Sequence, residues 1–360
     1  MIRYERNRTA VTSDKQYNPG IDALKFIAVI SIVLFHFADK GVVDLKASEI
    51  TLNWVILSVC KMGGGLGNCI FALITGWLSV NRNFDARKIL KLCVQVWIAS
   101  VIGQIAYCGI TGTMPGMKDL VKTVFPITLN TYWYFSSYIV IYMLMPYINK
   151  TLDEIGRRQH KVLSVILFVL FSVIPTFTTT KWLVGINQIA MMITLYVFGN
   201  YCRRYIDKTQ KMKMAIIICL SGLFIFLSEL AIRKFTSFNP YYFTWAMNKT
   251  PIVVFSTALF LLGVTSRSRE YMLVKIISKH AFGIYLIHIG WIHPLLFKRL
   301  FANDKYYTSP VMSLQMVACL LIVIAACVAI DYVYWRLYNS MLAKTVNRLG
   351  EKVNAYYFGC

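Results

Sequence analysis

The feature that most constrains this chain is a series of about ten apolar segments, each close to the length that crosses a lipid bilayer. They span residues 21–38, 54–80, 89–108, 131–149, 162–178, 182–201, 213–232, 250–266, 276–297 and 311–335. With 57% apolar and 15% charged residues and a mean hydropathy of +0.56, the composition also differs from that of a soluble domain. The sequence therefore predicts an all-α polytopic integral membrane protein with about ten transmembrane helices.

The basic residues predict the orientation of these helices. In a soluble protein the net charge of +22 would suggest a nucleic-acid partner, but 25 of the 38 Lys and Arg residues lie on the side of both termini. By the positive-inside rule that side is cytoplasmic, so we expect a multi-pass protein of the plasma or inner membrane, in contact with membrane lipids and not with nucleic acid. We expect no cleaved signal peptide. The predicted regions are a basic cytoplasmic tail at 1–19, a transmembrane domain at 20–336 and a cytoplasmic tail at 337–360.

The nine cysteines and five histidines do not form a recognisable metal or disulfide pattern. Most cysteines fall inside apolar segments, and none forms a Cys-x-x-Cys pair. Cysteines of this kind are typical of small core residues. We therefore expect neither a disulfide framework nor a metal site.

The first apolar segment carries a line of ionisable residues. Lys25 and His36 are eleven residues apart, which in a helix is roughly 16 Å along the axis and within about 20° of the same face. Asp22 falls near the same stripe. Charge in the hydrocarbon is costly, so such a stripe faces protein or water and is a functional candidate. The alternative is that Asp22 and Lys25 are ordinary flanking charges and His36 an interfacial residue.

Three further patterns each allow two interpretations. Basic residues at 87, 88 and 91 open the third segment, either as topology-determining charge or as a phosphate-binding patch. The glycines of Gly63–Gly67 favour close helix packing over a broken-helix ligand loop. Tyrosines repeat at helical spacing at 134, 138 and 142, a stripe that is more typical of interhelical packing than of a substrate track.

Five stretches, in order along the chain, together resemble membrane-bound acyltransferase family 3, whose members acylate surface glycans and lipid-linked sugars. They are GIDALKFIAVISIVLFHF, IFALITGWLS, ARKILK, YWYFSSYIVIYMLMP and FGIYLIH. The resemblance covers residues 20 to about 300, without the extracellular hydrolase-like domain that some members append.

The chain also departs from the family pattern. Lys25 stands where the family usually has Arg, and Lys88 and Lys91 replace an Arg-x-x-Arg pair. Lysine keeps the charge but lacks the planar fork that binds phosphate through two hydrogen bonds. Phe35 precedes His36 where some members carry Asp, so no adjacent carboxylate orients this imidazole.

The resemblance implies an O-acyltransferase, in the first place an O-acetyltransferase. It would move an acyl group from cytoplasmic acyl-CoA, a co-substrate and not a tightly bound cofactor, to a hydroxyl of a cell-surface or lipid-linked polysaccharide. Within this scheme the catalytic candidates are His36, as general base, and Lys25, on the cytoplasmic side of the same helix. The nucleotide end of the donor would be held by Lys88, Lys91 and Arg87. Candidate substrate or oxyanion groups are His288, Tyr285, Asn68 and Glu229.

Other functions remain open at this point. The acyl group could be succinyl, and transfer could be direct or pass through an acyl-histidine. A transporter or exporter of glycan precursors would also carry polar stripes, although we find no inverted repeat with paired broken helices. The chain could also be a silent partner in a polysaccharide synthesis complex, or a homo-oligomer.

Overall fold

A computed structural model describes residues 17–40, 49–178, 187–244, 246–266 and 269–358. Most of the predicted tail at 1–19 and the start of the predicted segment 182–201 lie outside the described residues. Within the described ranges the regular structure is helical and contains no β-strand. The predicted all-α class is confirmed for this part of the chain.

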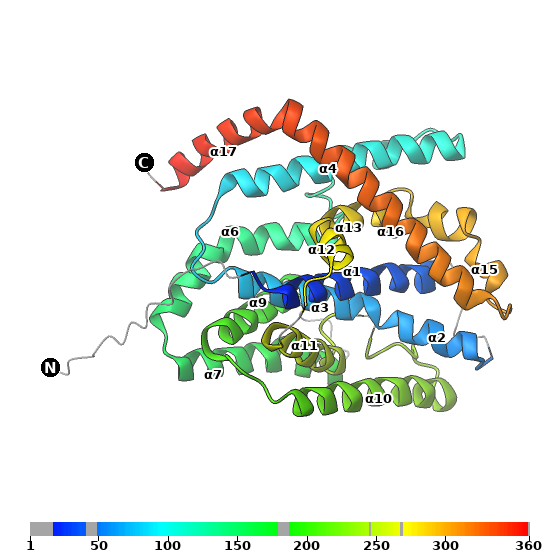
Figure 1. Cartoon of the computed structure of the whole chain (residues 1–360). Coiled ribbons are helices and arrows are strands. Elements are labelled where there is room, and N and C mark those ends of the chain that lie inside the picture. Colours follow the sequence, from blue (N-terminus) through cyan, green and yellow to red (C-terminus); the bar gives the residue numbers. More distant parts are fainter. Residues whose placement is uncertain (1–16, 41–48, 179–186, 245, 267–268, 359–360) are drawn as a thin grey trace.

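The described residues contain fourteen helices of eight residues or more. They are α1 (Pro19–Lys40), α2 (Leu52–Lys61), α3 (Gly63–Leu78), α4 (Ala86–Thr111), α5 (Met117–Val124), α6 (Trp133–Glu154), α7 (Arg157–Phe168), α9 (Asn187–Tyr205), α10 (Lys211–Phe235), α11 (Thr250–Thr265), α12 (Met272–Lys279), α13 (Ala281–Ile289), α16 (Met312–Leu337) and α17 (Ala343–Phe358). Shorter elements are α8 (Ile174–Phe177), α14 (His293–Leu295), α15 (Asn303–Tyr306) and the π-helical turns η1 (Val169–Val173), η3 (Leu296–Leu300) and η4 (Tyr338–Leu342). In Figure 1 α1, α3, α4, α6 and α10 run in roughly one direction, and α1 begins at the same end of the bundle at which α17 finishes.

Several of these helices are long and apolar enough to cross a membrane. Six such spans occur among the described residues: Pro19–Asp39, Leu52–Leu78, Ala86–Thr111, Arg157–Phe177, Lys211–Phe235 and Met312–Tyr356. A seventh is obtained if the bent pair α12 and α13 counts as one span. The other predicted segments, 131–149, 182–201 and 250–266, coincide with α6, α9 and α11. A multi-pass helical membrane protein is therefore confirmed, and the described residues contain six or seven spans by length and composition.

Helix α1 lies in the core of the bundle, and glycines let α3 approach it closely. A Cβ added at Gly63 would lie 2.0 Å from the carbonyl oxygen of Ser31, and one added at Gly67 would lie 2.7 Å from that of Ala28. A side chain at either position would push the two helices apart. The predicted close packing at Gly63–Gly67 is thus confirmed.

One predicted segment differs from the observed helices, and the predicted tail forms a helix. The segment 276–297 is not one helix, because the chain bends by 57° at His280, between α12 and α13. The region after residue 336, expected as a tail, continues through η4 into α17, which packs on α4. There the side chain of Asn354 accepts a hydrogen bond from the Ala86 backbone and donates one to Asp85.

Candidate active site

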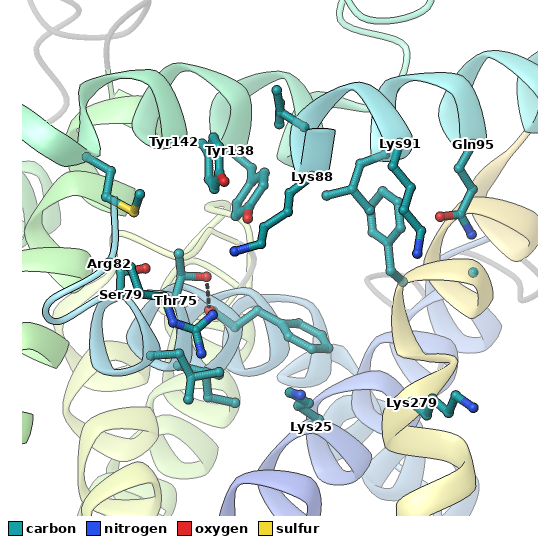
Figure 2. A pocket seen from close by; sticks show the side chains of 18 of the residues that line it. Lys25, Thr75, Ser79, Arg82, Lys88, Lys91, Gln95, Tyr138, Tyr142 and Lys279 are labelled. Atoms are coloured by element: carbon teal, nitrogen blue, oxygen red, sulfur yellow. Dashed lines mark hydrogen bonds between the residues drawn. The ribbon is translucent and has the colours of Figure 1, made fainter. Parts of the chain in front are cut away.

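A cavity of about 460 Å³ lies between α1, α3, α4, α6, α13 and α16 (Figure 2). Five cationic side chains line it: Lys25, Arg82, Lys88, Lys91 and Lys279. Among its described lining residues, Asp331 carries the single carboxylate. The cavity therefore has an excess of positive charge, which suits an anionic ligand.

The first turn of α4 places two of these cations. The side chain of Asp85 caps the helix by accepting a hydrogen bond from the Arg87 backbone nitrogen at 3.1 Å. Lys88 and Lys91 follow one turn apart and so share a face. In Figure 2 Lys88 extends toward Tyr138, and Lys25 approaches the cavity from the opposite wall. The three lysines selected from the sequence therefore meet in one cavity.

Arg87 is placed differently from its neighbours. Its Nε lies 3.0 Å from Oδ1 of Asp85, and Arg87 is not among the residues that line the cavity. A Cβ added at Gly350 of α17 would lie 2.6 Å from its Cγ. Arg87 thus braces the contact between α4 and α17.

Sequence reasoning missed two cavity cations, Arg82 and Lys279, which are among the 25 basic residues that predict the orientation. Arg82 lies three residues after the IFALITGWLS stretch and directly after Asn81, which has a φ of 58°. Its closeness to that stretch is the one signal in the sequence that could have indicated its role. Lys279 ends α12, and its role at the cavity depends on the bend at His280, which no local pattern indicates.

Aromatic rings of α16 and η4 hold Lys91. Its Nζ lies 4.0 Å from the centroid of the Trp335 ring and 5.7 Å from that of Tyr338. Such cation–π contacts restrict a side chain that would otherwise be flexible. Lys91 is therefore fixed in position at the cavity wall.

Asp331 of α16 is buried in the cavity wall. Its carboxylate accepts a hydrogen bond from Nε2 of Gln95 at 2.7 Å and pairs with Nδ1 of His280 at 2.6 Å. A Cβ added at Gly283 would lie 2.1 Å from Oδ1 of Asp331, so a glycine is required there. Gln95 and His280 are therefore the partners that compensate this buried carboxylate.

The other end of α1 carries a cluster of three imidazoles. The ring of His36 lies edge-on to the rings of His288 and His293, with centroids 5.3 Å and 4.5 Å away. His288 is fully buried, and its Nδ1 lies 2.5 Å from the carbonyl oxygen of Ile284. Since a carbonyl only accepts, Nδ1 carries the proton, and Nε2 of the neutral ring is an acceptor. Sequence reasoning missed His293, which follows the FGIYLIH stretch by five residues.

The imidazole cluster and the cavity are linked by packed aromatic rings. Phe71 lines the cavity and contacts Tyr134, which in turn contacts Tyr285, one turn before His288. The Tyr134 hydroxyl donates to the backbone oxygen of Asn68 at 3.4 Å. His36 itself does not line the cavity.

Glu229 and Asp22 lie outside both groups. Glu229 is buried and accepts a hydrogen bond from the Thr244 hydroxyl at 3.2 Å. Asp22 accepts hydrogen bonds from Tyr17 and from Ser278 of α12. Within the described ranges, no group of three His, Cys, Asp or Glu side chains could hold a metal ion.

Comparison with known proteins places the chain in a family. The model of the acyltransferase domain of acyltransferase family 3 matches residues 18–332, nearly the whole chain. Neither the comparison with curated proteins nor that with solved structures gives a match. The matched range contains every residue of the cationic cavity and of the imidazole cluster except Trp335. The chain therefore belongs to acyltransferase family 3, and it is a membrane acyltransferase.

Proposed function

We propose that this acyltransferase moves an acetyl group from cytoplasmic acetyl-CoA to a hydroxyl of a cell-surface or lipid-linked polysaccharide. In this proposal all ten predicted segments cross the plasma or inner membrane, and both termini lie in the cytoplasm. The described start of α1 and end of α17 lie at the same end of the bundle, in agreement with this orientation (Figure 1).

The excess of cations in the cavity carries the proposal. Coenzyme A presents several phosphate groups, which bind best to Lys and Arg side chains. Lys25, Lys88 and Lys91 would hold them together with Arg82, whose guanidinium supplies the planar fork that the two lysines of α4 lack. Because Lys25 lies near the start of α1, this is the cytoplasmic end of the bundle in the proposed orientation.

His36 would act at the other end of α1. In its neutral form it accepts the proton of the acceptor hydroxyl while the oxygen bonds to the thioester carbonyl carbon. When the tetrahedral intermediate collapses, the carbon–sulfur bond breaks, and the leaving thiolate takes the proton back from His36. The arm of the donor would cover the roughly 16 Å between Lys25 and His36.

His288 would support this reaction by orienting His36 and not by stabilising the oxyanion. An Nδ1 proton committed to Ile284 leaves Nε2 without a proton, so a neutral His288 cannot donate to an oxyanion. It can instead accept a hydrogen bond from His36 and fix which nitrogen of His36 is the base. We therefore assign His288 as a positioning residue.

The test is acetyl transfer from radiolabelled acetyl-CoA to polysaccharide by the purified protein in detergent. We expect turnover in the native protein and none in His36→Ala at unchanged elution volume. His160→Gln is the matched control, because His160 is buried against Val197 of α9, away from the cavity. Turnover in His36→Ala would refute the base assignment. Movement of glycan across vesicles without consumption of acetyl-CoA would instead favour an exporter.

A further inference from the structure

A second cavity, of about 320 Å³, shares no lining residue with the cationic one. It lies between two helix pairs, since α7 packs on α9 and α10 packs on α11. Its walls are nearly all apolar and include Phe168, Leu195, Phe198 and Ile217. In Figure 1 α7, α10 and α11 lie along one edge of the bundle, with α1 and α3 between them and α4. We call this cavity the apolar groove.

One end of the apolar groove is defined by contacts between the helices. Arg157 at the start of α7 donates to the backbone oxygen of Tyr205 at the end of α9 at 3.5 Å. Thr209, in the loop before α10, hydrogen-bonds Thr265 at the end of α11 at 2.6 Å. Lys161 lies at this end of the groove, one turn after Arg157.

The dimensions of the groove suit part of a hydrocarbon chain. From Lys161 to Phe168 the wall formed by α7 is about 10 Å long, roughly a third of the 30 Å core of a bilayer. A volume of this size holds about ten groups as large as a water molecule at roughly 30 Å³ each. The groove therefore accommodates a stretch of one acyl chain and not a whole lipid.

The charge at the Lys161 end favours an anionic headgroup. Lys161 is exposed and lines the groove, whereas no acidic side chain does so among its described lining residues. Further cations lie at the same ends of the helices, namely Arg157, Arg158, Lys208, Lys211 and Lys213. The acids at these ends are Asp153, Glu154 and Asp207, and Asp153 pairs with Arg204 at 2.5 Å, so that the cations outnumber the acids.

We propose that the apolar groove binds one acyl chain of an anionic phospholipid, with the lipid phosphate held by Lys161. A chain already in a bilayer gains no hydrophobic free energy by entering the groove, because its surroundings are hydrocarbon in either place. Selection of one lipid must therefore come from its fit to the groove and from its charge. A single lysine near an anionic membrane surface corresponds to a preference of about fivefold.

The experiment is native mass spectrometry of the full chain, exchanged from detergent into equimolar 1-palmitoyl-2-oleoyl phosphatidylglycerol and phosphatidylcholine. We expect the native protein to retain phosphatidylglycerol in preference to phosphatidylcholine. Lys161→Gln should lower that ratio about fivefold. Val254→Phe, which fills the groove from α11, should lower the total retained lipid. Lys161→Gln removes the positive charge, whereas Val254→Phe fills the space for the acyl chain. Each variant tests the proposal separately, so the test still stands if one of them misfolds.

Lys208→Gln is the matched control, because Lys208 is an exposed cation that adds to the charge at the same end but does not line the groove. Its lipid ratio should fall by less than that of Lys161→Gln, because Lys208 attracts the headgroup only from a distance. Equal retention of the two lipids by the native protein would overturn the proposal, as would an equal loss in Lys208→Gln and Lys161→Gln. Retention of a second polypeptide in place of a phospholipid would overturn it as well.

Discussion

Replacing Lys91 by Gln is the most informative perturbation of the cationic cavity, because the structure separates this lysine from its two neighbours. Lys91 is half-buried with its Nζ over Trp335, whereas the side chain of Lys88 is 60% exposed and that of Arg87 points to Asp85. The three cations lie within one turn and a half of α4. Replacing any one of them by Gln removes a single positive charge, so the three variants differ in how exposed the lost charge was and in what it contacted.

The expected magnitude follows from this burial. A hydrogen bond to a charged group contributes about 1.5–3 kcal/mol when its partners are buried. Since Lys91 is only half-buried, we take the lower limit, which is about a tenfold rise in the KM for acetyl-CoA. An exposed ion pair such as that of Lys88 contributes about 0.2–1 kcal/mol, so Lys88→Gln should raise KM by at most about fivefold. Arg87→Gln should leave KM unchanged.

The assay is initial-rate kinetics of acetyl transfer with acetyl-CoA varied at saturating acceptor. The phosphates remain bound in both the ground and the transition state, so kcat should not change. Lys91→Arg keeps the charge and should restore most of the affinity. The difference in the KM for acetyl-CoA between Lys91→Gln and the native protein should become smaller at high salt, because salt screens the charge of Lys91. A KM in Lys91→Gln no higher than in Arg87→Gln, or a loss confined to kcat, would refute the assignment of the cavity to the donor.

Three further predictions concern positioning, packing and protonation. His288→Gln should lower kcat while leaving the KM for acetyl-CoA unchanged, because His36 loses its orienting partner; an equal rise in KM would contradict this in the same assay. Gly63→Ala should lower the Tm in detergent by an amount equivalent to about 1–3 kcal/mol, since its Cβ would meet a backbone oxygen of α1, whereas Gly109→Ala, with nothing within 4 Å, should not lower it. Burial opposes ionisation of Asp85, but hydrogen bonds from α4 and α17 outweigh it and lower the pKa of this carboxyl. At pH 7 the native protein should therefore have a higher Tm than Asp85→Asn. This difference should disappear as the pH falls below about 3.9, the ordinary pKa of an Asp, and through the lowered pKa of Asp85. A Tm difference that does not change with pH would contradict this prediction.

The helical class and one end of the site were predictable from local pattern. The apolar segments predict where helices form, and Lys25, Lys88 and Lys91 lie near the starts of their segments. The structure has each of them near the start of a helix. The positive-inside rule predicts that those starts lie on one side of the membrane. That these lysines face a common cavity follows from packing, which the spacing alone does not encode.

The elements that sequence reasoning missed depend on contacts between distant residues. Asp331 and His280 are 51 residues apart, and neither lies in a pattern that indicates burial or pairing. There is no proline near the bend at His280, so the sequence predicts a single helix for the apolar segment 276–297. His293 reaches His36 only because α14 starts beside the end of α1.

The last helix shows that the boundaries of homology are not those of the folded unit. The family match ends at residue 332, yet Asn354 of α17 hydrogen-bonds both Asp85 and the backbone of Ala86. A protein expressed only over the matched range would therefore lose the contacts that α17 makes with the start of α4, the helix that carries Lys88 and Lys91. A bulky affinity tag fused close behind α17 would be attached to the helix that makes these contacts. Purification handles for this enzyme thus belong at the amino end, or behind a long spacer at the other.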